Sequence, residues 1–207
     1  MLLKRLQVGV LGTNCYVLGC ELTGEGAVID PGGDGDRILQ EITSLQLQIK
    51  YIIHTHGHGD HIAANGELKE ATGARILIHE GDASFLTDPR KSLISYSGSS
   101  GKLTSADQLL QEGDQIKIGE EITLQVIHTP GHTPGCICLD EGQHLFSGDT
   151  LFAGSIGRTD LPGGSYRSLI ESVEQKVFTL TGDRIIYPGH GPETTLADEK
   201  ASNPFFR

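Results

Sequence analysis

Four side chains of the kinds that bind metal ions lie within six consecutive residues, in the segment Thr55-His56-Gly57-His58-Gly59-Asp60-His61. No helix, strand or loop needs such a cluster in order to fold. His56 and His58 are two residues apart, so their imidazoles point the same way from an extended segment. The adjacent residues Asp60 and His61 point to different sides. One short turn can therefore serve two metal ions, one through each pair.

Three further candidate ligands follow along the chain, each with a glycine next to it: His132, Asp149 and His190. Imidazoles suit zinc or iron, and a carboxylate can span two cations. The neighbouring glycines fit this interpretation, because they permit tight turns and let the backbone lie close to a ligand. The sequence therefore predicts that the three downstream residues complete the site begun by the first cluster.

Short apolar segments predict the strands that deliver these ligands. They cover residues 51–53, 122–127, 136–139, 144–146 and 184–187. The first leads directly into His56, and the second leads into the turn that carries His132. The third and fourth form a predicted hairpin ahead of Asp149, and the last precedes His190. Ligands therefore come from turns that follow strands in both halves of the chain.

Helical patterns lie between these strands and predict an α/β protein. The helices are expected over residues 35–47, from Asp60 to Gly73, and from an N-cap at Ser165 to Gly182, with further strands within residues 1–33 and over 75–79. Residues 88–105 are rich in serine and predict a mobile loop near the mouth of the site. No linker divides the chain, so we expect one domain over residues 1–207.

Composition and charge exclude several classes of partner. Lys and Arg total 16 against 27 Asp and Glu, which gives a formal net charge of −11. An acidic chain without a basic stripe is a poor partner for nucleic acid. The sequence contains no run of about 18 apolar residues, so no membrane-spanning helix is expected. The N-terminus lacks the apolar core and cleavage site of a signal peptide, so a cytoplasmic location is expected.

The cysteines and the remaining histidines favour structural roles. The cysteines lie in apolar segments and form no C-x-x-C pair, which favours buried thiols: Cys15, Cys20, Cys136 and Cys138. Cys136 comes four residues after His132, which leaves a thiol near the site open. Four histidines occur on or beside apolar strands and fall on no motif position, which favours structural roles: His54, His79, His128 and His144.

The order of these ligands resembles the metallo-β-lactamase superfamily, in which a His-x-His-x-Asp-His motif is followed by a lone His, a bridging Asp and a last His. All these blocks are present between residues 55 and 191. The resemblance implies an αββα sandwich of two mixed β-sheets flanked by helices. It also implies one metal ion held by His56, His58 and His132, and a second held by Asp60, His61 and His190, with Asp149 bridging the two.

Such a site implies hydrolysis by a metal-bridging hydroxide. Two cations about 3.5–4 Å apart clamp the attacking and departing atoms, and zinc lowers the pKa of bound water to around 7. No Ser or Cys nucleophile is needed. Asp60 and Asp149 are the expected catalytic carboxylates. Zinc is the expected metal, although iron and manganese accept the same ligands.

Two further segments narrow the resemblance to the short bacterial members of the glyoxalase II group, which are hydroxyacylglutathione hydrolase-like. These segments are residues 151–160, Leu-Phe-Ala-Gly-Ser-Ile-Gly-Arg-Thr-Asp, and the terminal Asn-Pro-Phe-Phe-Arg of residues 203–207. Together with the last histidine block, they imply hydrolysis of a thioester such as S-lactoylglutathione. The expected partner is therefore a small-molecule thioester. No oligomeric state is predicted.

The sequence departs from full-length glyoxalase II in two ways. The C-terminal helical region that grips glutathione in that group is not expected here. The basic and tyrosine residues that follow the bridging Asp align roughly with Arg158 and Asp160. Arg158 can still hold a carboxylate in a bidentate manner, which makes it the candidate substrate-binding residue. Asp160 would repel an anionic substrate unless it orients Arg158. The sequence is equally compatible with a purely structural ion pair between Arg158 and Asp160.

Three alternative functions are also considered for this sequence pattern. A mononuclear iron persulfide dioxygenase shares the Gly-Arg-Thr-Asp stretch and the Gly135-Cys136 pair that follows His132. A metallohydrolase of another ester or a lactone uses the same ligands. A metal-binding protein without turnover has no chemical need for two complete ligand sets, so the seven residues argue against it.

Overall fold

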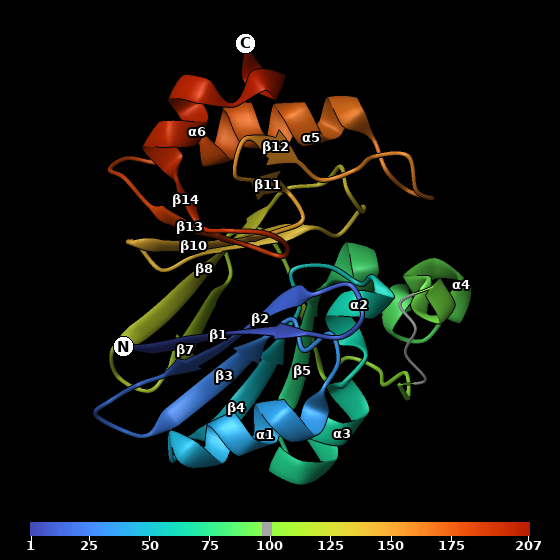
Figure 1. Ribbon diagram of the computed structural model, residues 1–207, viewed down its shortest axis with the longest axis vertical. Coiled ribbons are helices and arrows are strands. Elements are labelled where there is room, and N and C mark those ends of the chain that lie inside the picture. The colour runs from blue at the N-terminus through green and yellow to red at the C-terminus, as the bar shows by residue number, and fades with distance from the viewer. Residues whose placement is uncertain (97–100) are drawn as a thin grey trace.

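Two six-stranded sheets pack face to face in the computed structural model, which describes residues 1–96 and 101–207 (Figure 1). An apolar core fills the space between them, with Leu18 and Ile53 from the first sheet and Leu124 from the second. Tyr16 of the first sheet contacts Phe146 of the second edge to face, with ring centroids 5.3 Å apart. The two sheets are therefore joined by one continuous apolar layer.

The first sheet follows the order of the chain, antiparallel over its first three strands and parallel over the rest. Its strands are β1 (Leu2–Val8), β2 (Thr13–Gly19), β3 (Glu25–Ile29), β4 (Gln48–Ile53), β5 (Arg75–His79) and β6 (Gln108–Leu110). Parallel strands need crossover connections, which the helices between them supply.

The second sheet has the order β14-β13-β10-β9-β8-β7, with the neighbours β13 and β10 parallel and the other pairs antiparallel. Its strands are β7 (Gln115–Ile118), β8 (Ile122–His128), β9 (Ile137–Asp140), β10 (His144–Gly148), β13 (Ile185–Pro188) and β14 (Thr194–Thr195). A separate small hairpin joins β11 (Leu151–Phe152) to β12 (Ser155–Ile156).

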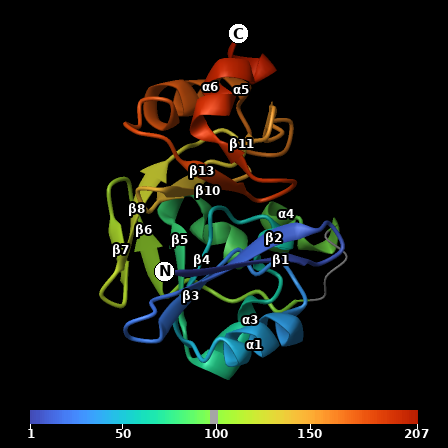
Figure 2. The ribbon, with the colours of Figure 1, turned by 60° about the vertical axis from the view of Figure 1, so that its left-hand side comes forward.

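Helices cover the outer faces of both sheets (Figures 1 and 2). Helices α1 (Gly35–Ser44) and α3 (Asn65–Thr72) lie on the first sheet, and α5 (Tyr166–Ser172) and α6 (Leu196–Ser202) lie on the second. Ile38 and Leu68 pack into the core beneath the first pair of helices, and Leu169 and Leu196 pack into the core beneath the second pair. The four layers confirm the αββα sandwich of two mixed sheets that the resemblance implied.

Short helical segments fill several connections. They are α2 (Gly59–Ile62), α4 (Pro89–Ser92), 3-10 turns at Glu80–Leu86, Ile94–Tyr96 and Pro204–Phe206, and a π turn at Val173–Val177. Within the described part of the chain, no helix is both long enough and apolar enough to cross a membrane.

The strand predictions agree with the structure, and two helix predictions were partly wrong. The helix expected from Asp60 to Gly73 is broken between α2 and α3, because the Ala64 amide donates to the Pro31 carbonyl at 3.0 Å. It does end at Gly73, whose φ of 69° suits glycine. The helix capped by Ser165 is α-helical only to Ser172 and continues as the π turn, so it ends before Gly182.

The segment 88–105, predicted as an irregular mobile loop, contains α4 and the 3-10 turn at Ile94–Tyr96. Asp88 caps α4 by accepting a hydrogen bond from the Arg90 amide. Residues 97–100 of that prediction lie outside the described residues.

Candidate metal centre

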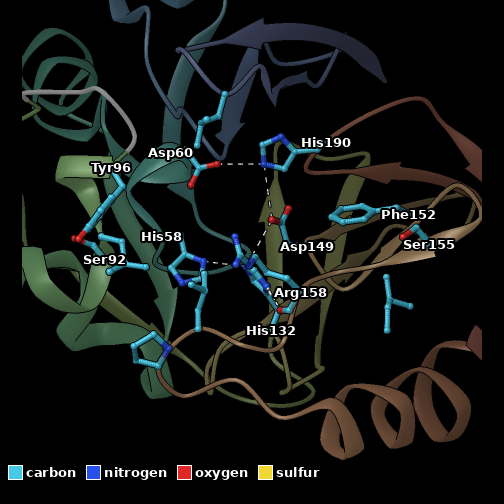
Figure 3. Close-up of a pocket in the computed structure, with 15 residues that line it drawn as sticks. His58, Asp60, Ser92, Tyr96, His132, Asp149, Phe152, Ser155, Arg158 and His190 are labelled. Atoms are coloured by element: carbon cyan, nitrogen blue, oxygen red, sulfur yellow. Dashed lines mark hydrogen bonds and ion pairs between the residues drawn. The ribbon is translucent and has the colours of Figure 1, made fainter.

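The seven predicted ligands converge at one end of the sandwich, beside α2. His56 and His58 follow β4, and α2 carries Asp60 and His61. The other three follow strands of the second sheet: His132 lies in the turn after β8, Asp149 follows β10 and His190 follows β13. Figure 3 shows five of these side chains turned toward one cavity. Strand ends of both sheets therefore supply the cluster.

The first group of ligands consists of three buried imidazoles. One nitrogen from each of His56, His58 and His132 lies within 4.8 Å of the other two. The Nδ1 atom of His58 faces the Nε2 atom of His132 at 2.9 Å. The Arg158 carbonyl accepts a hydrogen bond from His132 Nδ1 at 2.7 Å, which leaves Nε2 directed into the cluster.

The second group consists of Asp60, His61 and His190, whose ligand atoms also lie within 4.8 Å of one another. His190 Nε2 is 3.1 Å from Asp60 Oδ2, and His61 Nε2 is 3.6 Å from the same oxygen. The Thr13 hydroxyl donates to Asp60 Oδ2 at 3.2 Å and helps to hold the carboxylate in place.

Asp149 lies between the two groups. Its Oδ1 atom is 3.5 Å from His61 Nε2, and its Oδ2 atom is 3.6 Å from His132 Nε2 and 3.8 Å from His190 Nε2. The carboxylate therefore faces histidines of both groups, as a ligand shared by two cations must.

The buried donor atoms of the cluster fit divalent metal ions. Buried polar atoms are normally hydrogen-bonded. Four ligand atoms of the cluster are buried without a hydrogen-bond partner, namely Nε2 of His56, His58 and His61 and Oδ1 of Asp149, and four such atoms lie outside it, on Asn14, His54 and Asn65. A side chain at Gly189 would overlap Asp149 and the His61 ring, so the backbone has to approach the cluster closely at that position.

The protonation of His61 differs from that of His56 and His58. Burial, aided by neighbouring imidazoles, lowers the pKa of His58 to about 3 and also lowers the pKa of His56 well below its ordinary value. Burial alone would lower the pKa of His61 as well. The facing carboxylates, Asp149 first among them, outweigh burial and raise the His61 pKa to about 10. In the metal-free chain at neutral pH, His56 and His58 are therefore neutral and His61 carries a proton.

We expect metal uptake to release this proton. A metal ion and a proton compete for His61 Nε2, so the apparent affinity of the second group should rise up to about tenfold per pH unit between pH 6 and 8. Calorimetric titration of the metal-free protein with zinc, in buffers of different ionisation enthalpy, measures the apparent zinc affinity and the number of protons released. An affinity and proton release that do not change with pH would contradict this assignment.

Asp30 orients two of the ligands, a role that sequence reasoning missed. Its Oδ2 atom is 3.0 Å from His61 Nδ1 and also accepts a hydrogen bond from the Thr55 hydroxyl at 2.6 Å. The same hydroxyl lies 3.3 Å from His56 Nδ1. Burial by itself would raise the pKa of Asp30, but His61 and His54 outweigh it and lower that pKa to about 2. The available signal was an Asp-Pro-Gly-Gly turn directly after a buried strand.

Asp82 joins the two ligand turns and was also missed. This fully buried carboxylate accepts hydrogen bonds from the Gly57 amide at 2.9 Å, the Thr133 hydroxyl at 2.7 Å and the Gly135 amide at 2.7 Å. Gly57 lies between His56 and His58, and Thr133 follows His132. Asp82 therefore fixes the position of one histidine turn relative to the other.

The cluster forms one side of a cavity of about 770 Å³ (Figure 3). Ser92, Leu93 and Tyr96 line it, so this part of segment 88–105 does lie beside the site. Arg158 also lines the cavity. Its guanidinium donates two hydrogen bonds of 2.8 Å to Asp160, and both side chains are more than half exposed.

The four remaining histidines lie outside the two ligand groups and have other neighbours. His54 is buried beside Asp30, with its Nδ1 atom 3.8 Å from the carboxylate. His79 and His128 stack with ring centroids 3.9 Å apart, and His144 pairs with Glu141 at 2.7 Å. All four cysteines are buried and free. Burial raises the pKa of Cys136 and raises that of Cys138 to about 11, so both remain thiols at neutral pH.

Similar proteins carry names that agree with this geometry. Hydroxyacylglutathione hydrolase GloC of Haemophilus influenzae is 40% identical over 187 residues, which cover 86% of this chain and 86% of that protein. The probable metallo-hydrolase YqgX of Bacillus subtilis is 35% identical, over 98% of this chain and 96% of that protein.

Three solved structures share the fold over nearly the whole chain. The BLEG-1 B3 metallo-beta-lactamase is 36% identical with a TM-score of 0.92, over 99% of both chains. ETHE1 from Myxococcus xanthus is 32% identical with a TM-score of 0.84, over 99% of this chain and 84% of that one. TTHA1623, solved in a di-iron-bound form, is 32% identical with a TM-score of 0.86, over 98% of this chain and 99% of that one.

The family model described as the metallo-beta-lactamase superfamily matches residues 8–190. That region contains every residue of the cluster, and the cluster fits a metal site. The chain belongs to the metallo-beta-lactamase superfamily, whose enzymes are metallohydrolases.

Proposed function

We propose that this chain is a dinuclear metallohydrolase that cleaves a thioester such as S-lactoylglutathione into a hydroxy acid and a thiol. The observation that carries the proposal is the position of Asp149 between two complete groups of ligands at one cavity. The 40% identity to a protein named hydroxyacylglutathione hydrolase supports a thioester as the substrate class.

Seven residues would hold the metal ions. One ion would bind His56, His58 and His132, and the other would bind Asp60, His61 and His190, with Asp149 shared. When bound, two divalent cations lower the pKa of water and stabilise negative charge that develops on a carbonyl oxygen. Zinc is the proposed metal, and the di-iron form of TTHA1623 supports iron as the substitute.

The chain's own side chains orient these ligands and handle the proton. Asp30 and the Arg158 carbonyl hold the outer nitrogens of His61 and His132, which fixes the nitrogen that each ring turns inward. Asp60 and Asp149 both line the cavity, so they are the carboxylates available to take up the proton that hydrolysis releases. Water adds to the carbonyl carbon, the carbon–sulfur bond breaks, and the departing sulfur takes the proton.

Thiol release tests this proposal. Metal-free protein reconstituted with zinc should release glutathione from S-lactoylglutathione, and the same protein without metal should not. Absence of thiol release from fully zinc-loaded protein would contradict it. Ester and lactone substrates in the same assay distinguish a thioesterase from a broader hydrolase.

Arg158 is the proposed contact for an anionic end of the substrate. Asp160 occupies Nε and Nη2 of the guanidinium, which leaves Nη1 for a substrate carboxylate and fixes the orientation of the group. Because the pair is exposed, Arg158→Ala should raise KM for S-lactoylglutathione only about two- to fivefold. Its zinc content should equal that of the wild type. Loss of zinc, measured by atomic emission, would instead make Arg158 a structural residue.

A mononuclear iron persulfide dioxygenase is the second candidate. The likeness to ETHE1 favours it, and one histidine group with Asp149 is sufficient to hold a single iron. The intact second group is the observation against it. Oxygen consumption by iron-loaded protein with glutathione persulfide would favour this candidate over the hydrolase.

A further inference from the structure

Apolar side chains form most of the wall around the candidate metal centre. They come from three separate segments and include Leu11, Leu93, Tyr96, Phe152, Ile156 and Leu161. Figure 3 shows Tyr96 on one side of the cluster and Phe152 on the other. Phe152 also lies edge to face with His190, with ring centroids 6.4 Å apart. The apolar wall therefore begins directly beside the ligands.

Two of these side chains contribute little to the folded core. Leu11, on the turn between β1 and β2, is 54% exposed, and Tyr96 is 82% exposed. Single exposed apolar residues are ordinary, but apolar groups that collect around a cavity mark a site for an apolar ligand. Leu11 and Tyr96 reach the same cavity from segments 85 positions apart in the chain.

The wall offers little charge to bind a polar group. Among the described residues that line the cavity, Arg158 is the one Lys or Arg, and Asp160 already accepts two of its hydrogen bonds. The remaining charged lining groups, Asp60 and Asp149, belong to the ligand cluster. Apart from the contact proposed for Arg158, recognition away from the reacting carbonyl therefore depends on apolar contact.

We propose that this wall is the binding site for an apolar acyl group of about four to eight carbons, so the preferred substrates are medium-chain acyl thioesters. This inference rests on the proposed thioester hydrolysis and specifies its substrate class. A lactoyl group is small and carries a hydroxyl, so it can cover few of the apolar side chains that line the cavity. A longer aliphatic chain covers the apolar side chains and excludes water from them.

The test compares acyl groups on a fixed carrier. With zinc-loaded protein, kcat/KM for the acetyl, butyryl, hexanoyl and octanoyl thioesters of glutathione should rise about two- to fourfold per added methylene, at least to hexanoyl. Leu11→Ser should lower the hexanoyl-to-acetyl ratio at least about threefold. Leu22→Ser is the matched control, because Leu22 is also an exposed turn leucine, 69% exposed, and does not line the cavity. Its ratio should equal that of the wild type.

A flat dependence on chain length, or a preference for lactoyl over hexanoyl, would overturn the inference while leaving thioester hydrolysis intact. If no thioester is cleaved, the proposed function fails. Binding of free carboxylic acids then tests whether the wall is a site for an apolar acyl group. Calorimetry should then show that hexanoate binds zinc-loaded protein at least about tenfold more tightly than acetate, and that Leu11→Ser reduces this difference. Equal binding of the two acids would overturn the inference.

Discussion

Replacing Asp149 with alanine is expected to abolish thioester turnover and to lower the metal content from two ions per chain to one or fewer. The reason is its position: the two carboxylate oxygens lie within 3.8 Å of histidines from both ligand groups. Removing it takes a ligand from each ion and one negative charge from between two cations. We expect kcat/KM to fall at least about 10³-fold, measured by thiol release.

Asp160→Ala is the control for this variant. It removes a carboxylate beside the same cavity but outside both ligand groups, so its metal content should match the wild type. Circular dichroism on the metal-free proteins checks that Asp149→Ala still folds. Full activity together with two bound metals in Asp149→Ala would be incompatible with a dinuclear site that shares this residue.

Replacing Asp82 with alanine should destabilise the fold and weaken metal binding together. The change leaves the buried amides of Gly57 and Gly135 without an acceptor. Each unpaired buried amide costs about 1–3 kcal/mol, so the free energy of unfolding of the metal-free protein should fall by about 2–5 kcal/mol. Loosening of the two histidine turns should lower zinc affinity about 10- to 100-fold. Urea unfolding and zinc titration measure the two effects.

Glu174→Ala provides the comparison for Asp82→Ala. Glu174 is an exposed carboxylate in the π turn, so its loss should change the free energy of unfolding by less than about 0.5 kcal/mol. Asp82→Asn separates the effect of shape from that of charge, because it keeps the side-chain volume and one acceptor oxygen. We expect this variant to lose less stability and less zinc affinity than Asp82→Ala. Stability and zinc affinity of Asp82→Ala equal to the wild type would show that the Gly57 and Gly135 contacts do not hold the turns.

Much of the ligand cluster could be predicted because its signal is local. The first four ligands lie within six consecutive residues, and each later ligand follows a strand that is apolar enough to recognise. The strand over Arg75–His79 agrees with the prediction at both ends. The structure brings all seven predicted ligands together, and it places Arg158 at the same cavity.

The residues that were missed depend on contacts between distant parts of the chain. Asp82 meets Thr133 across 51 positions, and Asp30 meets His61 across 31. No spacing pattern encodes such pairs, because only the folded sheets bring them together. The break between α2 and α3 has the same origin, since the Pro31 carbonyl that accepts from Ala64 lies in another turn.

The proposed mechanism requires two metal ions to act together in thioester hydrolysis. The most direct test is thiol release from an acyl thioester of glutathione by metal-free wild-type protein supplied with zero to three equivalents of zinc. Because the two ligand groups share Asp149, activity should rise until two equivalents are bound and then level off. Activity that is complete at one equivalent, or absent at two, would contradict the claim.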